Sequence, residues 1–98
     1  MITHVVVFWT DKPYGENREK LLEGTRMLGK IPGVLEYRCG KAVASPRAVV
    51  DDSFAVAISM TFATQADADI YQAHPIHLEF IEKYVKPLAK RLVVYDFE

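Results

Sequence analysis

The chain has 98 residues, of which 50% are hydrophobic and 26% are charged, and its formal net charge at pH 7 is −1. A chain of this length forms one domain around one core, so we expect residues 1–98 to be a single unit. The balanced charge argues against nucleic acid or a membrane as partner, because both attract basic surfaces, and the single Cys39 excludes an internal disulfide.

Strand-like and helix-like segments follow one another along the chain. In order, we predict a strand over residues 2–10, a helix over 16–30, strands over 34–43 and 53–62, helices over 65–73 and 75–86, and a strand over 91–98. The first segment lacks the basic region and cleavage site of a signal peptide, and the lone cysteine fits a reducing compartment. These features predict a cytoplasmic protein.

The boundaries of the second helical region carry the clearest local signals. Thr64 is a candidate N-cap, with Asp67 three residues later in a weak capping box. Pro75 divides the region into two helices, and the residue before a proline avoids the helical conformation, so His74 is expected at the joint. Pro87 is expected to end the second helix.

The element order β-α-β-β-α-β predicts an α+β, ferredoxin-like protomer, in which a four-stranded antiparallel sheet carries both helices on one face. The third strand alternates most clearly, and its predicted buried side consists of Phe54, Val56, Ile58, Met60 and Phe62. The first and last strands are apolar on both sides, so the uncovered sheet face is expected to be an interface. The simplest partner is a second copy, which makes a homodimer through the sheet face.

Four polar side chains are predicted to converge in the gap between the second helical region and the sheet. His77 lies on the apolar stripe of its helix, and Tyr71 precedes the helix joint. His4 and Asp96 lie on the helix-facing sides of the first and last strands, which are neighbours in the ferredoxin-like strand order. The predicted catalytic residues are therefore His77, Tyr71, His4 and Asp96, and the predicted pocket residues are Phe8, Phe80, Ile81 and Tyr84.

Each of these residues also has a structural interpretation. A buried histidine often only bonds a backbone carbonyl, a tyrosine often fills the core, and Asp96 is close to the end of the chain. Metal binding is a further alternative, with His74 and His77 as ligands and His4 or Asp96 as a third. We predict no metal, because His74 lies outside the helix proper and no cysteine or carboxylate reinforces the pair. We predict no cofactor, because the chain has no glycine-rich phosphate loop and no covalent-hydrolase motif.

Three stretches resemble the stress-responsive dimeric α/β barrel (Dabb) family: HVVVFWTD near the start, HPIHLEFIEKYVKP in the second helical region and VVYDFE at the end. The resemblance implies that two ferredoxin-like protomers pair sheet to sheet into a dimeric barrel. One characterised family member, the plant olivetolic acid cyclase, closes a linear polyketide by aldol condensation. By similarity to that enzyme, His4, Tyr71, His77 and Asp96 fall on its site positions.

The resemblance implies a small carbonyl or aromatic ligand and cofactor-independent cyclase or lyase chemistry. In this hypothesis His77 is the general base, Asp96 holds its tautomer, and Tyr71 and His4 donate hydrogen bonds to the developing enolate. Two alternatives are a non-catalytic stress-response dimer with a structural or ligand-binding role, and a cofactor-free monooxygenase, which shares the barrel shape.

Overall fold

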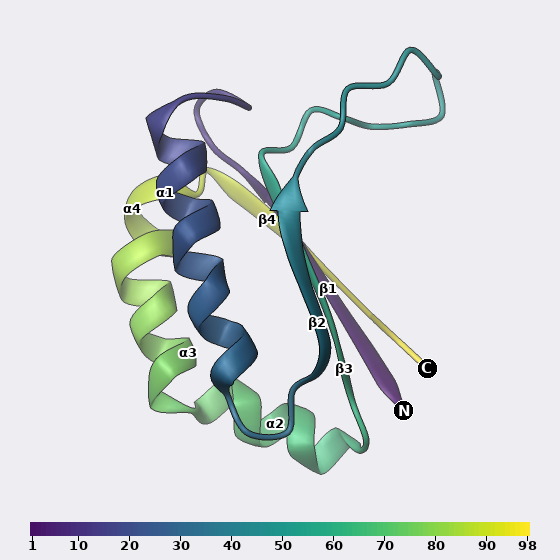
Figure 1. The fold of residues 1–98 in the computed structure, drawn as a ribbon, viewed down its shortest axis with the longest axis vertical. Coiled ribbons are helices and arrows are strands. Elements are labelled where there is room, and N and C mark those ends of the chain that lie inside the picture. Colours follow the sequence, from purple (N-terminus) through teal and green to yellow (C-terminus); the bar gives the residue numbers. More distant parts are fainter.

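The computed structural model describes all 98 residues, which form a four-stranded sheet with one helical layer (Figure 1). The strands are β1 (Ile2–Trp9), β2 (Leu35–Lys41), β3 (Val56–Phe62) and β4 (Arg91–Phe97). The helical segments are α1 (Glu16–Thr25), the 3-10 turn η1 (Arg26–Lys30), α2 (Gln65–Ala73), α3 (Pro75–Phe80), the π-helical turn η2 (Ile81–Val85) and α4 (Lys86–Leu88). None of these helices is long and apolar enough to cross a bilayer.

The sheet has the order β2-β3-β1-β4, and every pair of neighbouring strands is antiparallel. All helices lie on one face of this sheet (Figure 1), which confirms the predicted ferredoxin-like fold. Alternate residues of β3 are buried beneath the helices, and these are Val56, Ile58, Met60 and Phe62. The adjacency of β1 and β4 is also as predicted, and it leaves β4 at the edge of the sheet.

The two halves of the second helical region meet at His74. The hydroxyl of Thr64 accepts a hydrogen bond from the Asp67 amide at 3.2 Å and begins α2, as predicted. His74 has an extended backbone, and its Nδ1 accepts a hydrogen bond from the Ile76 amide at 3.1 Å. The imidazole of His74 therefore caps α3, and Pro75 occupies the first turn, where its missing N–H costs nothing.

The predicted end of this region at Pro87 is wrong, because helical structure continues to Leu88. Proline lacks an N–H and crowds the carbonyl four residues before it, so an ordinary α-helix is disfavoured here. The backbone accommodates Pro87 through η2, in which the Lys86 amide donates to the Ile81 carbonyl five residues earlier. This wider turn borders the candidate site described below.

The predicted start of the third strand at residue 53 is also wrong. The strand begins at Val56, and Phe54 lies on the opposite sheet face from the one predicted, with its ring 6.5 Å from the Trp9 ring. The Ala55 amide donates to the Phe8 carbonyl at 2.8 Å, so the chain stays attached to β1 without continuing the alternation. Phe54 is thereby removed from the helix-covered core.

The sheet face opposite the helices is uncovered in the protomer (Figure 1). Its bulky apolar side chains come from β1 and β4, namely Val5, Val7, Trp9, Val93, Tyr95 and Phe97. Tyr95 and Phe97 are 59% and 58% exposed. We call this surface the open face; its apolar character is typical of an interface.

A glycine brings α1 close to η2. A Cβ atom placed on Gly24 would lie 2.4 Å from Cγ of Tyr84, a separation that side-chain packing does not allow. The Tyr84 ring also stacks against Phe80, with ring centroids 6.1 Å apart. Gly24 therefore fixes where the second helical region sits over the sheet.

We expect Gly24→Ala to lower the free energy of unfolding by at least about 1 kcal/mol, because overpacking typically costs about 1–3 kcal/mol. This loss should appear in urea unfolding although alanine has the better helix propensity. Glu23→Ala is the control, since Glu23 is an exposed neighbour of Gly24 on α1 and its replacement should leave stability nearly unchanged. Equal stability of the two variants would contradict the close contact between α1 and η2.

Candidate active site

A cavity of about 210 Å³ lies between the second helical region and the sheet. Its wall consists of His4, Val6, Phe8, Ile58, Tyr71, Gln72, His77, Phe80, Ile81, Val85, Leu92 and Val94. Leu92 and Val94 lie on the helix-facing side of β4, yet they are 43% and 44% exposed. The helices thus leave the edge strand partly uncovered, and the cavity is accessible beside it.

The size and lining of the cavity limit what it can hold. Sites for drug-sized ligands usually occupy about 300–1,000 Å³, so this cavity suits a smaller compound. Nine of its twelve lining residues are hydrophobic, and the remaining polar groups face a mostly apolar space. Such a lining favours a compact, largely apolar molecule with a few oxygen atoms.

Three of the four predicted catalytic residues line this cavity together. The Tyr71 ring lies between the two histidines, with its centroid 4.7 Å from His77 and 5.8 Å from His4. Tyr71 is 1% exposed and His4 is 6% exposed. The predicted convergence of His4, Tyr71 and His77 is therefore present in the structure.

Asp96 lies behind the cavity wall and contacts His4. The pairing of β1 with β4 places His4 opposite Asp96, and His4 Nδ1 lies 2.5 Å from Asp96 Oδ1. A carboxylate accepts this bond, so Nδ1 of His4 carries the proton. The hypothesis that Asp96 orients His77 is wrong, because cross-strand pairing directs its carboxylate to His4 instead. Asp96 is a positioning residue for the His4 ring.

His77 is oriented by the backbone of α2. Its Nδ1 lies 3.0 Å from the Gln72 carbonyl oxygen, which accepts the Nδ1 proton. In the neutral ring, Nε2 then carries a free lone pair. Burial lowers the pKa of His77 below its usual value, a nearby His4 adds to this effect, and the Gln72 bond opposes it. His77 is therefore uncharged at neutral pH and can accept a proton.

The Tyr71 hydroxyl complements His77, because it is a hydrogen-bond donor rather than a proton acceptor. Burial of its hydroxyl raises the pKa of Tyr71 above its usual value. The hydroxyl thus remains protonated at neutral pH and can donate a hydrogen bond to a ligand oxygen. An uncharged base and a neutral donor on one apolar cavity are a suitable pair for proton transfer next to a carbonyl group.

The metal alternative finds no support in the positions of the histidines. His74 and His77 use their Nδ1 atoms for the Ile76 amide and the Gln72 carbonyl. Across the structure, no three His, Cys, Asp or Glu side chains are grouped so that they could hold a metal ion. The two imidazoles of the HPIH motif have separate roles, one at a helix cap and the other in the cavity.

The predicted pocket residues are only partly correct. Phe8, Phe80 and Ile81 line the cavity, whereas Tyr84 does not, because its ring packs on Gly24 of α1. Sequence reasoning also missed several wall residues, which are Val6, Ile58, Gln72, Val85, Leu92 and Val94. Strand alternation shared with His4 and Phe8 would have identified Val6, Leu92 and Val94, but no sequence signal predicts η2, which places Val85 at the wall.

The lowered pKa of His77 makes stability depend on pH in a defined direction. The unfolded chain binds a proton near pH 6.5, whereas folded His77 binds it only at lower pH. We therefore expect the free energy of unfolding to fall as pH decreases through about 6.5. The free energy of unfolding should stop falling once the pH is below the pKa of His77 in the folded protein. Urea unfolding between pH 5 and pH 7.5 measures this slope, which should be shallower in His77→Gln; an unchanged slope would contradict the half-buried, neutral imidazole.

Known structures with the same fold match this chain over nearly its whole length. A Dabb family protein with a ferredoxin-like fold from Mesorhizobium loti is 25% identical, with a TM-score of 0.78 over 99% of this chain and 94% of that chain. A hydroxynitrile lyase from Passiflora edulis is 22% identical, with a TM-score of 0.75 and coverage of 98% and 90%. A dimeric ferredoxin-like protein of unknown function from Thermobifida fusca is 19% identical, with a TM-score of 0.75 and coverage of 98% and 88%.

At identities of 22% and 19%, the second and third of these similarities show a shared fold. No curated protein matches the sequence. The family model for the stress-responsive A/B barrel domain (Dabb) matches residues 2–98, which confirms the resemblance seen in the sequence. The chain therefore belongs to the Dabb family.

Proposed function

We propose that the cavity binds a small carbonyl or aromatic compound and that His77 transfers protons on it without a cofactor. The observation that carries this proposal is the half-buried imidazole of His77, held through Nδ1 by the Gln72 carbonyl, on the wall of an apolar cavity beside the Tyr71 ring. General acid–base catalysis requires a base that is unprotonated at working pH, which for histidine is the neutral form, and that is close to the reacting proton. Burial of His77 provides the first condition, and its place on the cavity wall supports the second.

The proposed reaction begins with a ligand whose carbonyl oxygen faces Tyr71. Nε2 of His77 removes a proton from the carbon next to the carbonyl, and the electron pair of that C–H bond forms an enolate. The Tyr71 hydroxyl stabilises the negative oxygen by a hydrogen bond, and the imidazolium returns the proton to the product. The His4 ring, fixed by Asp96, supplies a second polar contact for the ligand.

A cyclase or lyase uses the same elementary step. After proton removal, the carbanion attacks a second carbonyl in a cyclisation, and the reverse sequence cleaves a carbon–carbon bond. A lyase occurs among proteins that share this fold, the hydroxynitrile lyase from Passiflora edulis. The choice between addition and cleavage depends on the ligand, while the base and the donor remain the same.

A second candidate function is ligand binding without catalysis. No buried side-chain nitrogen or oxygen in the chain lacks a hydrogen-bond partner, and at the cavity His4 bonds Asp96 and His77 bonds the Gln72 carbonyl. A satisfied polar network of this kind is compatible with a binding protein that only sequesters a small compound. The two functions differ in whether a bound ligand exchanges its acidic proton.

We expect the protein to speed the exchange of the methyl protons of acetophenone with D₂O, as measured by proton NMR. His77→Ala should remove about 10²–10⁴-fold of this acceleration, the usual contribution of general acid–base catalysis. Tyr71→Phe should remove about 10²-fold, because it lacks only the hydrogen-bond donor. His74→Asn is the matched control, since asparagine also caps helices and His74 is not part of the cavity wall.

The outcome separates the two functions. Acetophenone that binds the wild-type cavity without accelerated exchange would favour the binding protein over the catalyst. A His77→Ala variant that fails to fold, or that retains full exchange activity, would contradict the role of His77 as base.

We also propose that two copies pair through the open face to form the dimeric barrel. The apolar side chains of β1 and β4 on this face have no cover within the protomer. A twofold pair buries the same surface on both copies. The Thermobifida fusca protein, which shares this fold, is described as dimeric.

We expect Val7→Asp to convert the dimer to a folded monomer, because it buries two unpaired carboxylates at the twofold contact. Sedimentation velocity at micromolar concentration measures this change. Ile70→Asp is the control, since Ile70 is 58% exposed on α2, away from the open face. A dimer that persists in Val7→Asp would show that the copies do not pair through this surface.

A further inference from the structure

We propose that His4 donates a proton to the ligand on the face opposite to His77, so that the site inverts the configuration of the carbon next to the carbonyl group. The reaction class is then racemisation or epimerisation of a small ketone that has a stereocentre at this carbon. The inference rests on the proposed function and deepens it, because it gives His4 a catalytic role and proton exchange a stereochemical outcome.

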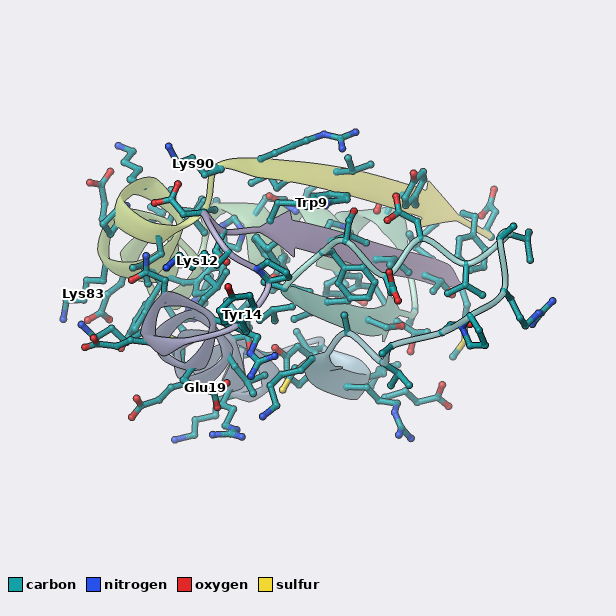
Figure 2. The ribbon with its side chains drawn as sticks, turned by 90° about the horizontal axis from the view of Figure 1, so that it is seen from above. Trp9, Lys12, Tyr14, Glu19, Lys83 and Lys90 are labelled. Carbon is teal, nitrogen blue, oxygen red and sulfur yellow. The ribbon has the colours of Figure 1, made fainter.

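The two histidines come from opposite layers of the fold. His4 lies on β1 of the sheet, and His77 lies on α3 of the helical layer, which covers one face of that sheet (Figure 1). On the outer side of this layer, Lys83 pairs with Glu79 at 2.6 Å and points away from the sheet (Figure 2). His77 instead lines the cavity together with His4. The cavity therefore has one imidazole on its sheet side and another on its helix side.

Each of these imidazoles has a free nitrogen. Nδ1 of His4 is bonded to Asp96. Nδ1 of His77 is bonded to the Gln72 carbonyl, and no protein group bonds Nε2 of either ring. Because no buried side-chain nitrogen in the chain lacks a hydrogen-bond partner, neither Nε2 is sealed in the core. His4 is 6% exposed and lines the cavity, so the cavity is the space that its Nε2 contacts.

Tyr71 and two phenylalanines limit how a ligand lies between the histidines. The Tyr71 ring is next to both imidazoles, and no protein group bonds its hydroxyl, which remains available to a ligand oxygen. Farther along β1, the Phe8 ring of the sheet meets the Phe80 ring of the helical layer edge-on, with centroids 6.0 Å apart. A flat ketone whose oxygen faces Tyr71 then has one face toward the sheet and the other toward the helices.

The proposed step follows from these positions. Nε2 of His77 removes the proton on the helix side, and the electron pair of the C–H bond forms the enolate that Tyr71 stabilises. His4, which has bound a water proton at Nε2, donates this proton to the same carbon from the sheet side, and the enolate electron pair forms the new C–H bond. His77 then releases its proton to water and His4 binds another. The net change is inversion with exchange of one proton.

Asp96 supports this role of His4. Its carboxylate accepts the Nδ1 proton at 2.5 Å, and its side chain is 58% exposed at the sheet edge. The bond fixes the orientation of the ring and places a negative charge beside it when Nε2 is protonated. If His77 alone removed and returned the proton, the carbon would keep its configuration. Inversion is therefore the signature of His4.

Propiophenone in D₂O distinguishes the two routes, whereas the rotating methyl group of acetophenone does not. The two methylene protons of propiophenone point to opposite faces of the bound ligand. If His77 returns a deuteron to the face from which it took the proton, the second proton never faces His77. If His4 delivers the deuteron from the other face, the remaining proton turns toward His77 and exchanges in a later turnover. Mass spectrometry counts the deuterons.

We expect the wild-type protein to introduce two deuterons. His4→Asn should slow the second exchange by about 10²-fold and leave the first nearly unchanged, because asparagine keeps a donor for Asp96 but has no group at the position of Nε2. The matched control is His74→Asn, the same substitution at a histidine outside the cavity wall, which should still introduce two deuterons.

Asp96→Ala tests the same step without changing the cavity wall. Because Asp96 is exposed, its replacement should leave the protein folded. The second exchange should slow about tenfold, the usual effect of losing a hydrogen bond to a charged group, while the first stays nearly unchanged. The split between the two exchanges is the readout that a merely structural role of Asp96 would not produce.

The outcomes separate this inference from the proposed function. Wild-type protein that adds one deuteron and stops overturns the role of His4 and leaves His77 as the base. The same conclusion follows if both His4→Asn and Asp96→Ala add two deuterons at the wild-type rates. Wild-type protein that adds no deuteron overturns proton transfer at this site altogether.

Discussion

The helices of this chain cover only one face of its sheet, and they stop short of the edge strand on that face. Two surfaces are left incomplete as a result. On the open face, the side chains of β1 and β4 have no cover, so association with a second copy is favoured by burial of apolar area. On the helix face, the gap beside Leu92 and Val94 remains as a cavity. The proposed dimer and the proposed active site thus share one cause.

Short-range features then give the cavity its chemistry. Pro75 ends α2 early, which places His74 at the cap and His77 one turn later against the cavity. The antiparallel pairing of β1 with β4 brings Asp96 to His4 across 92 residues of sequence. Burial, rather than a partner charge, is the main reason that His77 is uncharged, while a backbone carbonyl selects its tautomer. This division of roles differs from a triad, in which one carboxylate supports the base.

Much of this arrangement could be predicted from the sequence, because it depends on periodicity and on proline. Three predicted features are present in the structure: the alternation in β3, the cap at Thr64 and the break at Pro75. Each depends only on the conformational preferences of neighbouring residues. The positions that sequence reasoning missed depend on packing between distant segments. Tyr84 has the helical spacing of a pocket residue. Its ring nevertheless packs against α1, in the space that is free because Gly24 has no side chain. No local sequence pattern predicts the contact between Tyr84 and Gly24.

The partner of Asp96 illustrates the same limit. Strand parity places both His4 and His77 within plausible reach of its carboxylate, and only the β1–β4 register decides between them. The π-helical turn η2 depends both on Pro87 and on the packing of the helix against the sheet. No sequence pattern therefore predicts this turn. The sequence alone therefore predicts which region of the fold holds the site. It does not predict which side chains in that region bond to one another.

The proposed function requires that the gap between the second helical region and the sheet is an open, reactive cavity. We would determine the crystal structure of the protein soaked with acetophenone. We expect ligand density inside the cavity, with the carbonyl oxygen at hydrogen-bond distance from the Tyr71 hydroxyl and the methyl carbon facing Nε2 of His77. A closed gap filled by the side chains of Phe80, Ile81 and Val85, with no ligand density, would contradict a ligand site beneath the helices.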